Sequence, residues 1–149
     1  MQLTVRKSSF HSFAEKKKRL AQYQMLLREI QDDRLRLAQL AGRLMRQNPA
    51  GLPIGEVNSH FSGYEERIVQ NIANCERLAR EIQEFINGIE DSMIRRVFAL
   101  RYLNGYTWQK VAFVVGAHDE SVPRKRHDRY LKNEVSTALL PAFVCEEGA

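Results

Sequence analysis

The sequence predicts an all-α protein in which a long antiparallel, coiled-coil-like helical hairpin is followed by a C-terminal helix-turn-helix domain. Two long segments carry heptad-like apolar repeats, one on each side of a break that contains prolines and glycines. Two shorter helical segments follow near the C-terminus, joined by a glycine-containing turn, and the second is strongly basic. The 149 residues, 44% hydrophobic and 28% charged, suffice for a domain with a core and an extended element.

Residues 1–12 are expected to form a mobile basic arm. Ser12 can cap the helix that follows. The first turns of that helix carry the basic cluster Lys16, Lys17, Lys18 and Arg19, where the helix dipole disfavours positive charge. A solvated cluster is the favoured interpretation.

Residues 13–88 are predicted to form the hairpin and to mediate oligomerisation. The first long helix has two columns of heptad positions: Leu20, Leu27, Arg34 and Ala41 in one, and Tyr23, Ile30, Leu37 and Leu44 in the other. In the second helix the columns are Phe61, Ile68, Cys75, Ile82 and Ile89, and Tyr64, Asn71, Leu78 and Phe85. Arg34 and Asn71 either fix the register or lie at the edge of the apolar stripe. Two helices leave much of the apolar stripe exposed to water, so we expect the stripe to meet either the C-terminal domain or a second copy of the chain. We favour a homo-oligomer, and among these a dimer.

A helix is predicted from Asp91 to Leu103, with Gly88 as a break before it and Asp91 or Ser92 as its cap. Its arginines, Arg95, Arg96 and Arg101, are interpreted as solvated, with phosphate contact as the alternative. A turn at Asn104 and Gly105 ends this segment.

Residues 89–141 are predicted to form the helix-turn-helix domain, and 142–149 an apolar tail with an acidic end. Thr107 can cap a first helix that runs to Val115 and that Gly116 ends. Ser121 is the expected N-cap of a second helix that begins near Val122 and continues until Pro141.

The phase of the second helix assigns its two faces. Its inward face comprises Pro123, His127, Tyr130, Leu131 and Glu134, and its outward face comprises Lys125, Asp128, Arg129 and Lys132. Between residues 121 and 133 five basic residues stand against one acid, a net charge of +4. Such a surface suits phosphate contacts and guanine recognition. The candidate DNA-binding residues are Lys125, Arg129, Lys132, Arg124, Arg126, Ser121 and Lys110.

A family resemblance rests on the segment from Ile89 to Leu131. Its pattern is Arg101-Tyr102 at the end of one helix, then Gly105-Tyr106-Thr107-Trp108, Val111-Ala112, Gly116 and the basic helix. This segment resembles region 4 of bacterial sigma factors and is more closely similar to the ArpU-type late-operon regulators of phages and prophages. The resemblance implies that Thr107 to Val115 support a major-groove helix formed by Val122 to Asn133.

The expected function is therefore sequence-specific binding of double-stranded DNA by a transcriptional regulator of phage or prophage origin. The cluster at residues 16–19 is an alternative second DNA contact. One alternative function is a phage DNA-packaging recognition subunit like a small terminase, which would form a ring of many subunits. The other is a helical adaptor that binds RNA polymerase or another protein.

Enzymatic and membrane functions lack support in the sequence. The four histidines are scattered, and no phosphate loop, zinc-protease motif or nucleophile motif occurs, so we expect no enzyme, cofactor or metal site. His127 is interpreted as a packed residue, and Cys75 as a small core residue without a metal-binding partner. No apolar run approaches the ~18 residues that a membrane span requires, and no secretion signal is evident, so a cytoplasmic location is expected.

Overall fold

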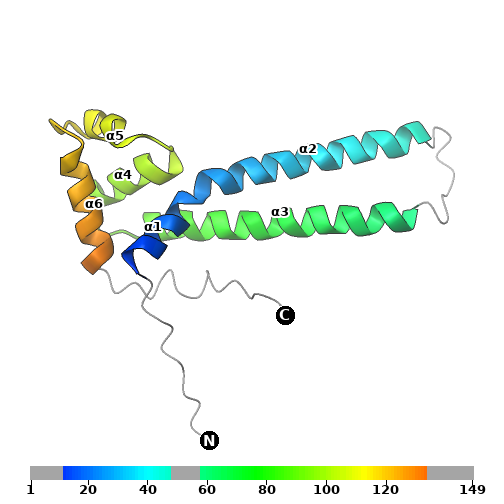
Figure 1. The fold of residues 1–149 in the computed structure, drawn as a ribbon, viewed down its shortest axis with the longest axis horizontal. Coiled ribbons are helices and arrows are strands. Elements are labelled where there is room, and N and C mark those ends of the chain that lie inside the picture. Colours follow the sequence, from blue (N-terminus) through cyan, green and yellow to red (C-terminus); the bar gives the residue numbers. More distant parts are fainter. Residues whose placement is uncertain (1–11, 48–57, 134–149) are drawn as a thin grey trace, which may run out of the picture. The chain divides into compact units, whose positions relative to one another are not determined.

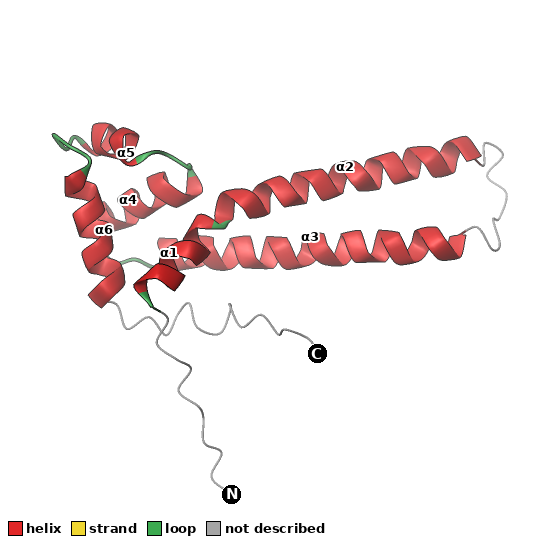
Figure 2. Cartoon of the chain, in the orientation of Figure 1, coloured by secondary structure: helices red, strands yellow, loops and turns green. Residues whose placement is uncertain are grey.

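The computed structural model describes residues 12–47 and 58–133, with side chains described for 12–47 and 63–133. All regular secondary structure in these ranges is helical, which confirms the predicted all-α class (Figures 1 and 2). The elements are α1 (Phe13–Ala21), α2 (Tyr23–Gln47), α3 (Asn58–Asn87), α4 (Ser92–Phe98), η1 (Ala99–Leu103), α5 (Trp108–Val115) and α6 (Ser121–Asn133). The expected mobile arm, the interhelical break, the helix continuation to Pro141 and the tail fall outside the described residues.

The described chain divides into two compact units. The hairpin unit contains the described residues between Met25 and Ala79. The terminal unit combines described residues up to Gln24 with those from Arg80 onward. This partition differs from the expected hairpin segment 13–88, because α1 and the ends of α2 and α3 join the C-terminal helices in one unit.

In the hairpin unit, α2 and α3 run antiparallel (Figure 1). Their buried residues are Leu26, Ile30, Asp33 and Leu40 from α2 and Ile68, Cys75 and Ala79 from α3. Asn71 donates its amide to Asp33 Oδ2 at 2.6 Å and to Glu29 Oε1 at 2.8 Å. Arg34 bridges to Glu76 at 2.7 Å on the surface. The buried carboxylate of Asp33 on α2 is therefore paired with the amide of Asn71 on α3, and this pairing favours one alignment of the two helices.

The predicted phase of α2 was half right. Of the column Tyr23, Ile30, Leu37 and Leu44, the first two residues are buried and the last two half-buried. The column Leu27, Arg34 and Ala41 was wrong, because these residues are exposed and Leu26, Asp33 and Leu40 face the core instead. The physical reason is the helix break at Gln22, whose N–H bonds Arg19 O at 3.1 Å. Leu20 lies before this break in α1, so it does not set the phase of α2.

The predicted phase of α3 holds for most of its length. Ile68, Cys75, Ile82 and Ile89 are buried as expected, and Phe61 lies outside the described side chains. In the second column Phe85 is buried and Asn71 and Leu78 are half-buried, whereas Tyr64 is 50% exposed, so its core assignment was wrong. The prediction of Cys75 as a core residue is confirmed. Burial raises the pKa of its thiol, and the carboxylates of Glu29 and Asp33 add to that effect.

The terminal unit is built around Phe98, which is fully buried. Asp91 caps α4 by accepting from Ile94 N–H at 2.9 Å, as one of the two predicted caps. The predicted helix from Asp91 to Leu103 is present, but its last five residues form a π turn in which Asn104 N–H bonds Ala99 O at 3.0 Å. Gly88 follows the last residue of α3, which agrees with the expected break.

The turn after η1 depends on Gly105 and Gln24. Gly105 has φ +72°, a conformation that a side chain would strain, and a Cβ would approach the Gln24 side chain to 3.3 Å. Gln24 donates its amide to the carbonyls of Tyr102 and Leu103 at 3.3 and 2.7 Å. These carbonyls lie at a helix end, where intrahelical donors are missing. Gln24 thus stabilises the turn that leads into the helix-turn-helix.

Candidate nucleic-acid interface

The first helix of the helix-turn-helix, α5, begins and ends where its sequence predicts. The Thr107 hydroxyl accepts from Lys110 N–H at 3.3 Å, and Gly116 ends the helix with φ 76°. Val111 and Ala112 are buried in the terminal unit, and Trp108 is half-buried. The small side chain of Ala112 lets α5 approach its neighbours closely, and α5 packs against α6.

The second helix, α6, begins at Ser121, so the prediction of Ser121 as the N-cap was wrong. Glu120 O accepts from Arg124 N–H, which makes Ser121 the first helical residue. Asp119 instead accepts from both the N–H and the hydroxyl of Ser121. These hydrogen bonds lower the pKa of the Asp119 carboxyl. An acidic group before the first turn is also favoured by the helix dipole.

The inward face of α6 agrees with the predicted phase. Pro123, His127 and Leu131 are buried at intervals of one turn, and Tyr130 is half-buried. Phe98 contacts two of these rings, with centroid distances of 4.7 Å to His127 and 5.4 Å to Tyr130. Because this face is held by the core, the orientation of the opposite face is fixed.

The outward face of α6 is cationic. Lys125, Arg129 and Lys132 are exposed, and so are Arg124 and Arg126. Arg124 forms an ion pair with Glu120. Asp128 was predicted to point outward with them, but it is half-buried and its carboxylate accepts from His127 Nδ1 at 2.8 Å. The hydrogen bond with the buried imidazole draws Asp128 inward, and its charge is withdrawn from the cationic face.

His127 links three elements of the terminal unit. The Tyr102 hydroxyl, from η1, lies 2.6 Å from Nε2, and the Trp108 ring, from α5, lies edge-on with centroids 5.0 Å apart. Tyr102 is a donor here, because burial raises the pKa of its hydroxyl above the usual range. Nε2 is then the acceptor, and Nδ1–H donates to Asp128. The interpretation of His127 as a packed residue is confirmed.

The charge state of His127 follows from its surroundings. Burial lowers the pKa of the imidazole, and the cations Lys17 and Arg101 act in the same direction. The hydrogen bond and charge of Asp128 oppose this effect without reversing it. A neutral imidazole with a satisfied hydrogen bond on each nitrogen is the form that this core accommodates.

Two arginines, one in α4 and one in η1, donate hydrogen bonds to backbone carbonyls. Arg95 Nη1 donates to Ile89 O and Arg101 Nη1 to Tyr106 O, each at 2.8 Å. Arg101 also lies over the Trp108 ring, 5.0 Å from its centroid. The interpretation of these two side chains as solvated was wrong, because each donates to a carbonyl in a segment between helices, where intrahelical donors are missing.

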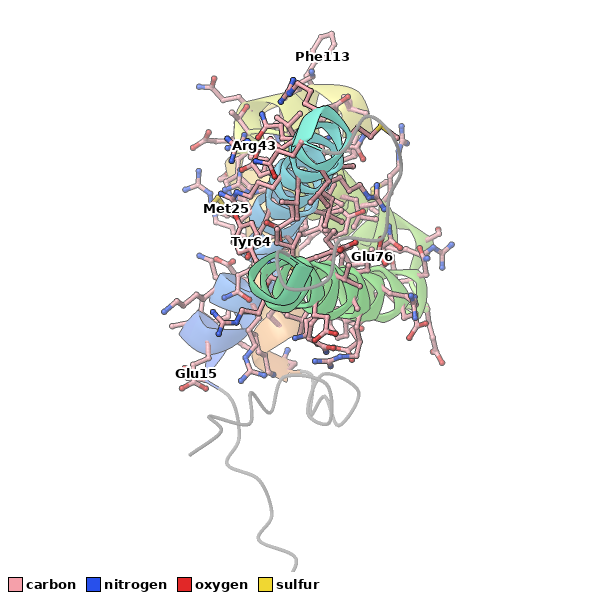
Figure 3. The ribbon with its side chains drawn as sticks, turned by 90° about the vertical axis from the view of Figure 1, so that its right-hand side faces the viewer. Glu15, Met25, Arg43, Tyr64, Glu76 and Phe113 are labelled. Carbon is pink, nitrogen blue, oxygen red and sulfur yellow. The ribbon has the colours of Figure 1, made fainter. Side chains whose placement is uncertain are left out.

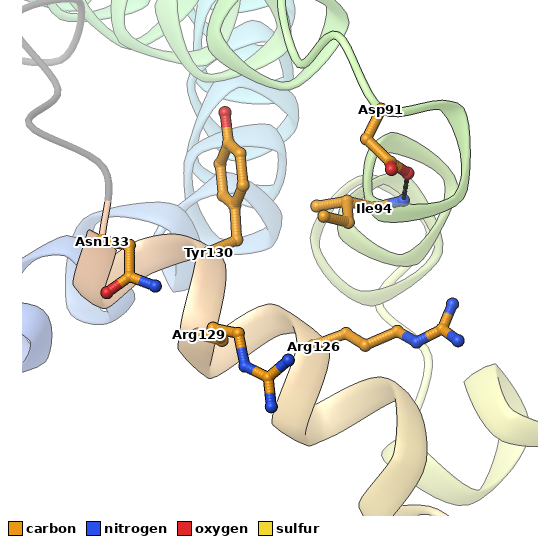
Figure 4. A pocket seen from close by; sticks show the side chains of 6 residues that line it. All are labelled: Asp91, Ile94, Arg126, Arg129, Tyr130 and Asn133. Carbon is orange, nitrogen blue, oxygen red and sulfur yellow. Dashed lines mark hydrogen bonds between the residues drawn. The ribbon is translucent and has the colours of Figure 1, made fainter.

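A groove runs along one flank of α6 (Figure 4). It is lined by Asp91, Ile94, Arg126, Arg129, Tyr130 and Asn133. The Asp91 carboxylate in this lining already caps α4. Arg126 and Arg129 extend from adjacent turns of α6 in this view, so two guanidinium groups border one side of the exposed face.

Helix α1 adds a part of the site that the predicted site residues did not include. Its capping box is complete, because Ser12 Oγ accepts from Glu15 N–H and Glu15 Oε2 from Ser12 N–H, each at 3.2 Å. Lys16 Nζ donates to Leu131 O, near the end of α6, at 3.0 Å. The interpretation of the basic cluster as solvated was therefore wrong for Lys16. The run of basic residues was visible in the sequence, but its partner lies 115 positions away.

The remaining predicted site residue, Lys110, is exposed on α5 and lies 3.9 Å from the centroid of the Tyr106 ring. Within the described ranges no group of three or more His, Cys, Asp or Glu side chains is arranged to hold a metal ion. The helices described there include none that is long and apolar enough to cross a membrane.

Comparison of the chain with models of protein families, with curated proteins and with solved structures finds no match.

Proposed function

We propose that this protein is a sequence-specific transcriptional regulator that binds double-stranded DNA, of the phage or prophage type that the segment from Ile89 to Leu131 resembles. The main support for this proposal is that α6 has one buried face and one exposed, cationic face. Pro123, His127 and Leu131 fix one face in the core, and the opposite face presents the exposed side chains of Lys125, Arg129 and Lys132.

This arrangement suits a helix in the major groove. Thirteen residues at 1.5 Å per residue give α6 a length of about 20 Å, and an α-helix fits the width of that groove. Arginine can bond O6 and N7 of guanine together, so we assign Arg129 to base contact. Lys125, Lys132 and Lys110 are suited to phosphates, with Arg124 and Arg126 at the flanks. Ser121, the first residue of α6, is not assigned a DNA contact, because Asp119 already engages its hydroxyl.

The first test is a binding titration at several salt concentrations. Purified protein is titrated onto duplex DNA from around its own gene and onto a scrambled duplex of equal length. We expect tight binding to one genomic segment and a steep fall of log K with log salt. Weak and equal binding to both duplexes would contradict sequence-specific recognition.

The hairpin unit supports assembly with a second copy of the chain. Leu27, Leu35 and Met45 of α2 are 37%, 59% and 76% exposed. They lie within about 80° of one another at 100° per residue. Residues 35–47 of α2 carry a net charge of +3 without an acid, whereas 25–34 carry two basic and three acidic residues, of which Asp33 is buried against α3. An antiparallel pair of α2 helices would keep the two basic halves apart. Two recognition helices would then serve two half-sites.

A second function, that of a helical adaptor for RNA polymerase or another protein, is favoured by one residue. Phe113 is 85% exposed and projects from α5 (Figure 3). Exposed aromatic side chains are common anchors of protein interfaces. Binding to purified RNA polymerase without DNA, weakened at least tenfold by Phe113→Ser, would support the adaptor. Equal binding by both forms, or none, would reject Phe113 as the anchor.

A further inference from the structure

In the terminal unit, two lysine side chains from different helices lie over the ring of Phe13. Lys17 Nζ lies 5.1 Å from the centroid of the Phe13 ring, and Lys132 Nζ lies 5.0 Å from the same centroid. The two ammonium groups are consequently no more than about 10 Å apart. Lys17 and Phe13 come from α1, whereas Lys132 comes from the last turn of α6.

The position of α1 beside α6 is fixed by more than this ring. Lys16 donates to Leu131 O, the carbonyl directly before Lys132. The capping box of Ser12 and Glu15 sets the first turn of α1. Lys17 is thus carried by an ordered helix that is bonded to the end of α6. Lys18, the next residue, is exposed.

The charge around this ring favours an anion. Residues 13–21 carry four basic residues and one acid, and that acid, Glu15, bonds the Ser12 N–H. The nearest acid of α6 in sequence, Asp128, is bonded to His127. Lys17 and Lys132 are both exposed, and two like charges this close together raise the local positive potential, which attracts an anion. Ammonium groups bind phosphate oxygens through short, charge-assisted hydrogen bonds.

We propose that Lys17, Lys18 and Lys132 form a binding site for the phosphate backbone of duplex DNA, placed beside the recognition surface of α6. The proposal rests on the proposed function, because Lys132 lies on the face of α6 that we assign to DNA. A site of this kind contacts phosphates without contacting bases, so it contributes affinity and orientation but no sequence preference.

The double variant Lys17→Ala/Lys18→Ala tests the proposal, with Arg67→Ala as the control. Arg67 is exposed on α3 in the hairpin unit. Binding to the genomic and scrambled duplexes is measured between low and high salt, after circular dichroism has shown native helix content. Each lost phosphate contact reduces the slope of log K against log salt by about 0.9 and weakens binding about fivefold at ~0.15 M salt. We expect this loss on both duplexes and an unchanged slope for Arg67→Ala.

The possible outcomes separate this inference from the proposed function. Wild-type protein that binds neither duplex would overturn both. Wild-type binding that the double variant leaves unchanged in affinity and slope would overturn the phosphate site alone. A loss confined to the genomic duplex would also overturn it, because phosphate contacts do not distinguish sequences.

Discussion

Arg129 combines an exposed guanidinium with a backbone position held by buried neighbours. His127 and Leu131, two residues away on either side, are both fully buried. The side chain can therefore approach a base edge without the helix having to be ordered on binding. Contact therefore costs the rotamer entropy of the arginine side chain but not the entropy of ordering the helix.

Replacement Arg129→Ala is expected to weaken binding to the genomic duplex by ~1–3 kcal/mol, because a guanine contact through two hydrogen bonds is lost. Binding to the scrambled duplex should change much less. The free energy of unfolding should stay within about 0.5 kcal/mol of wild type, since the side chain is exposed. Titration of both duplexes checks the prediction, with Arg67→Ala as the matched control. Equal weakening on both duplexes would mean that Arg129 contacts only phosphates.

His127 predicts a pH dependence of stability. Its pKa in the folded protein lies below the ordinary value of 6.5, so the unfolded chain takes up a proton first as the pH falls. The stabilising contribution is complete above about pH 6.5 and is lost as the pH falls from there through the lower folded-state pKa. The free energy of unfolding should decrease by at most about 1.4 kcal/mol per pH unit in this window.

Denaturant unfolding at several pH values between about 5 and 7.5 measures this effect. His127→Gln should flatten the curve and lower stability at neutral pH, because Gln only partly replaces the bonds to Tyr102 and Asp128. His118→Gln is the control, since His118 is exposed in the turn before α6. A full pH dependence retained by His127→Gln would show that another group causes it.

Among the elements, α2 and α3 pack through an apolar interface that includes the buried carboxylate of Asp33. Asp33 is 3% exposed and accepts from Asn71 and from Arg36, the latter at 2.7 Å. A buried carboxylate without enough donors is costly, whereas an apolar pair of similar volume is often neutral or stabilising. The contact is thus better explained by alignment of the helices than by stability.

Replacement Asn71→Ala should destabilise the protein by about 1–3 kcal/mol, because Asp33 loses a donor in a buried setting. The double variant Asp33→Leu/Asn71→Leu should recover most of that loss and loosen the alignment of α2 and α3. Denaturant unfolding measures the first effect, and cross-linking of cysteine pairs introduced across the hairpin measures the second. Unchanged stability in Asn71→Ala would contradict a role for this hydrogen bond.

The π turn of η1 affects the candidate interface in a way that is not apparent from the sequence. Its extra residue per turn shifts the phase of the chain just before Tyr102, whose hydroxyl bonds His127 on α6. The same turn exposes carbonyls that Gln24 satisfies. A local irregularity in one helix thereby connects the N-terminal segment with the helix-turn-helix inside the terminal unit.

For the whole molecule, the proposed pairing of α2 helices predicts a concentration-dependent dimer. Leu35→Asp/Met45→Asp places charges on the exposed apolar face and should raise the dimer dissociation constant at least tenfold, about 1.4 kcal/mol. Analytical ultracentrifugation over a range of concentrations measures it. Val69→Asp is the control, because Val69 is 51% exposed but lies on α3. A wild-type protein that stays monomeric at high concentration would reject the pairing, and a ring of many subunits would favour the packaging alternative.

The all-α class and much of the candidate interface were predictable from the amino-acid sequence. The Asp91 cap, Thr107, Gly116 and the inward phase of α6 at His127 were predictable because they depend on residues within a few positions of one another. Capping groups and one-turn spacings act over such distances in any surroundings. The set of exposed cations on α6 follows from the same periodicity.

The features that join distant segments could not be predicted in this way, because they depend on how the helices pack. The break at Gln22 separated α1 from α2 and changed which α2 column faces the core. The bond from Lys16 to Leu131 joins residues 115 positions apart, and that from Gln24 to Tyr102 joins residues 78 apart. Such contacts form because carbonyls at helix ends lack intrahelical donors and accept hydrogen bonds from side chains that pack beside them. Periodicity shows that a helix has an apolar face, but the packing of other helices selects which positions at its edges are buried.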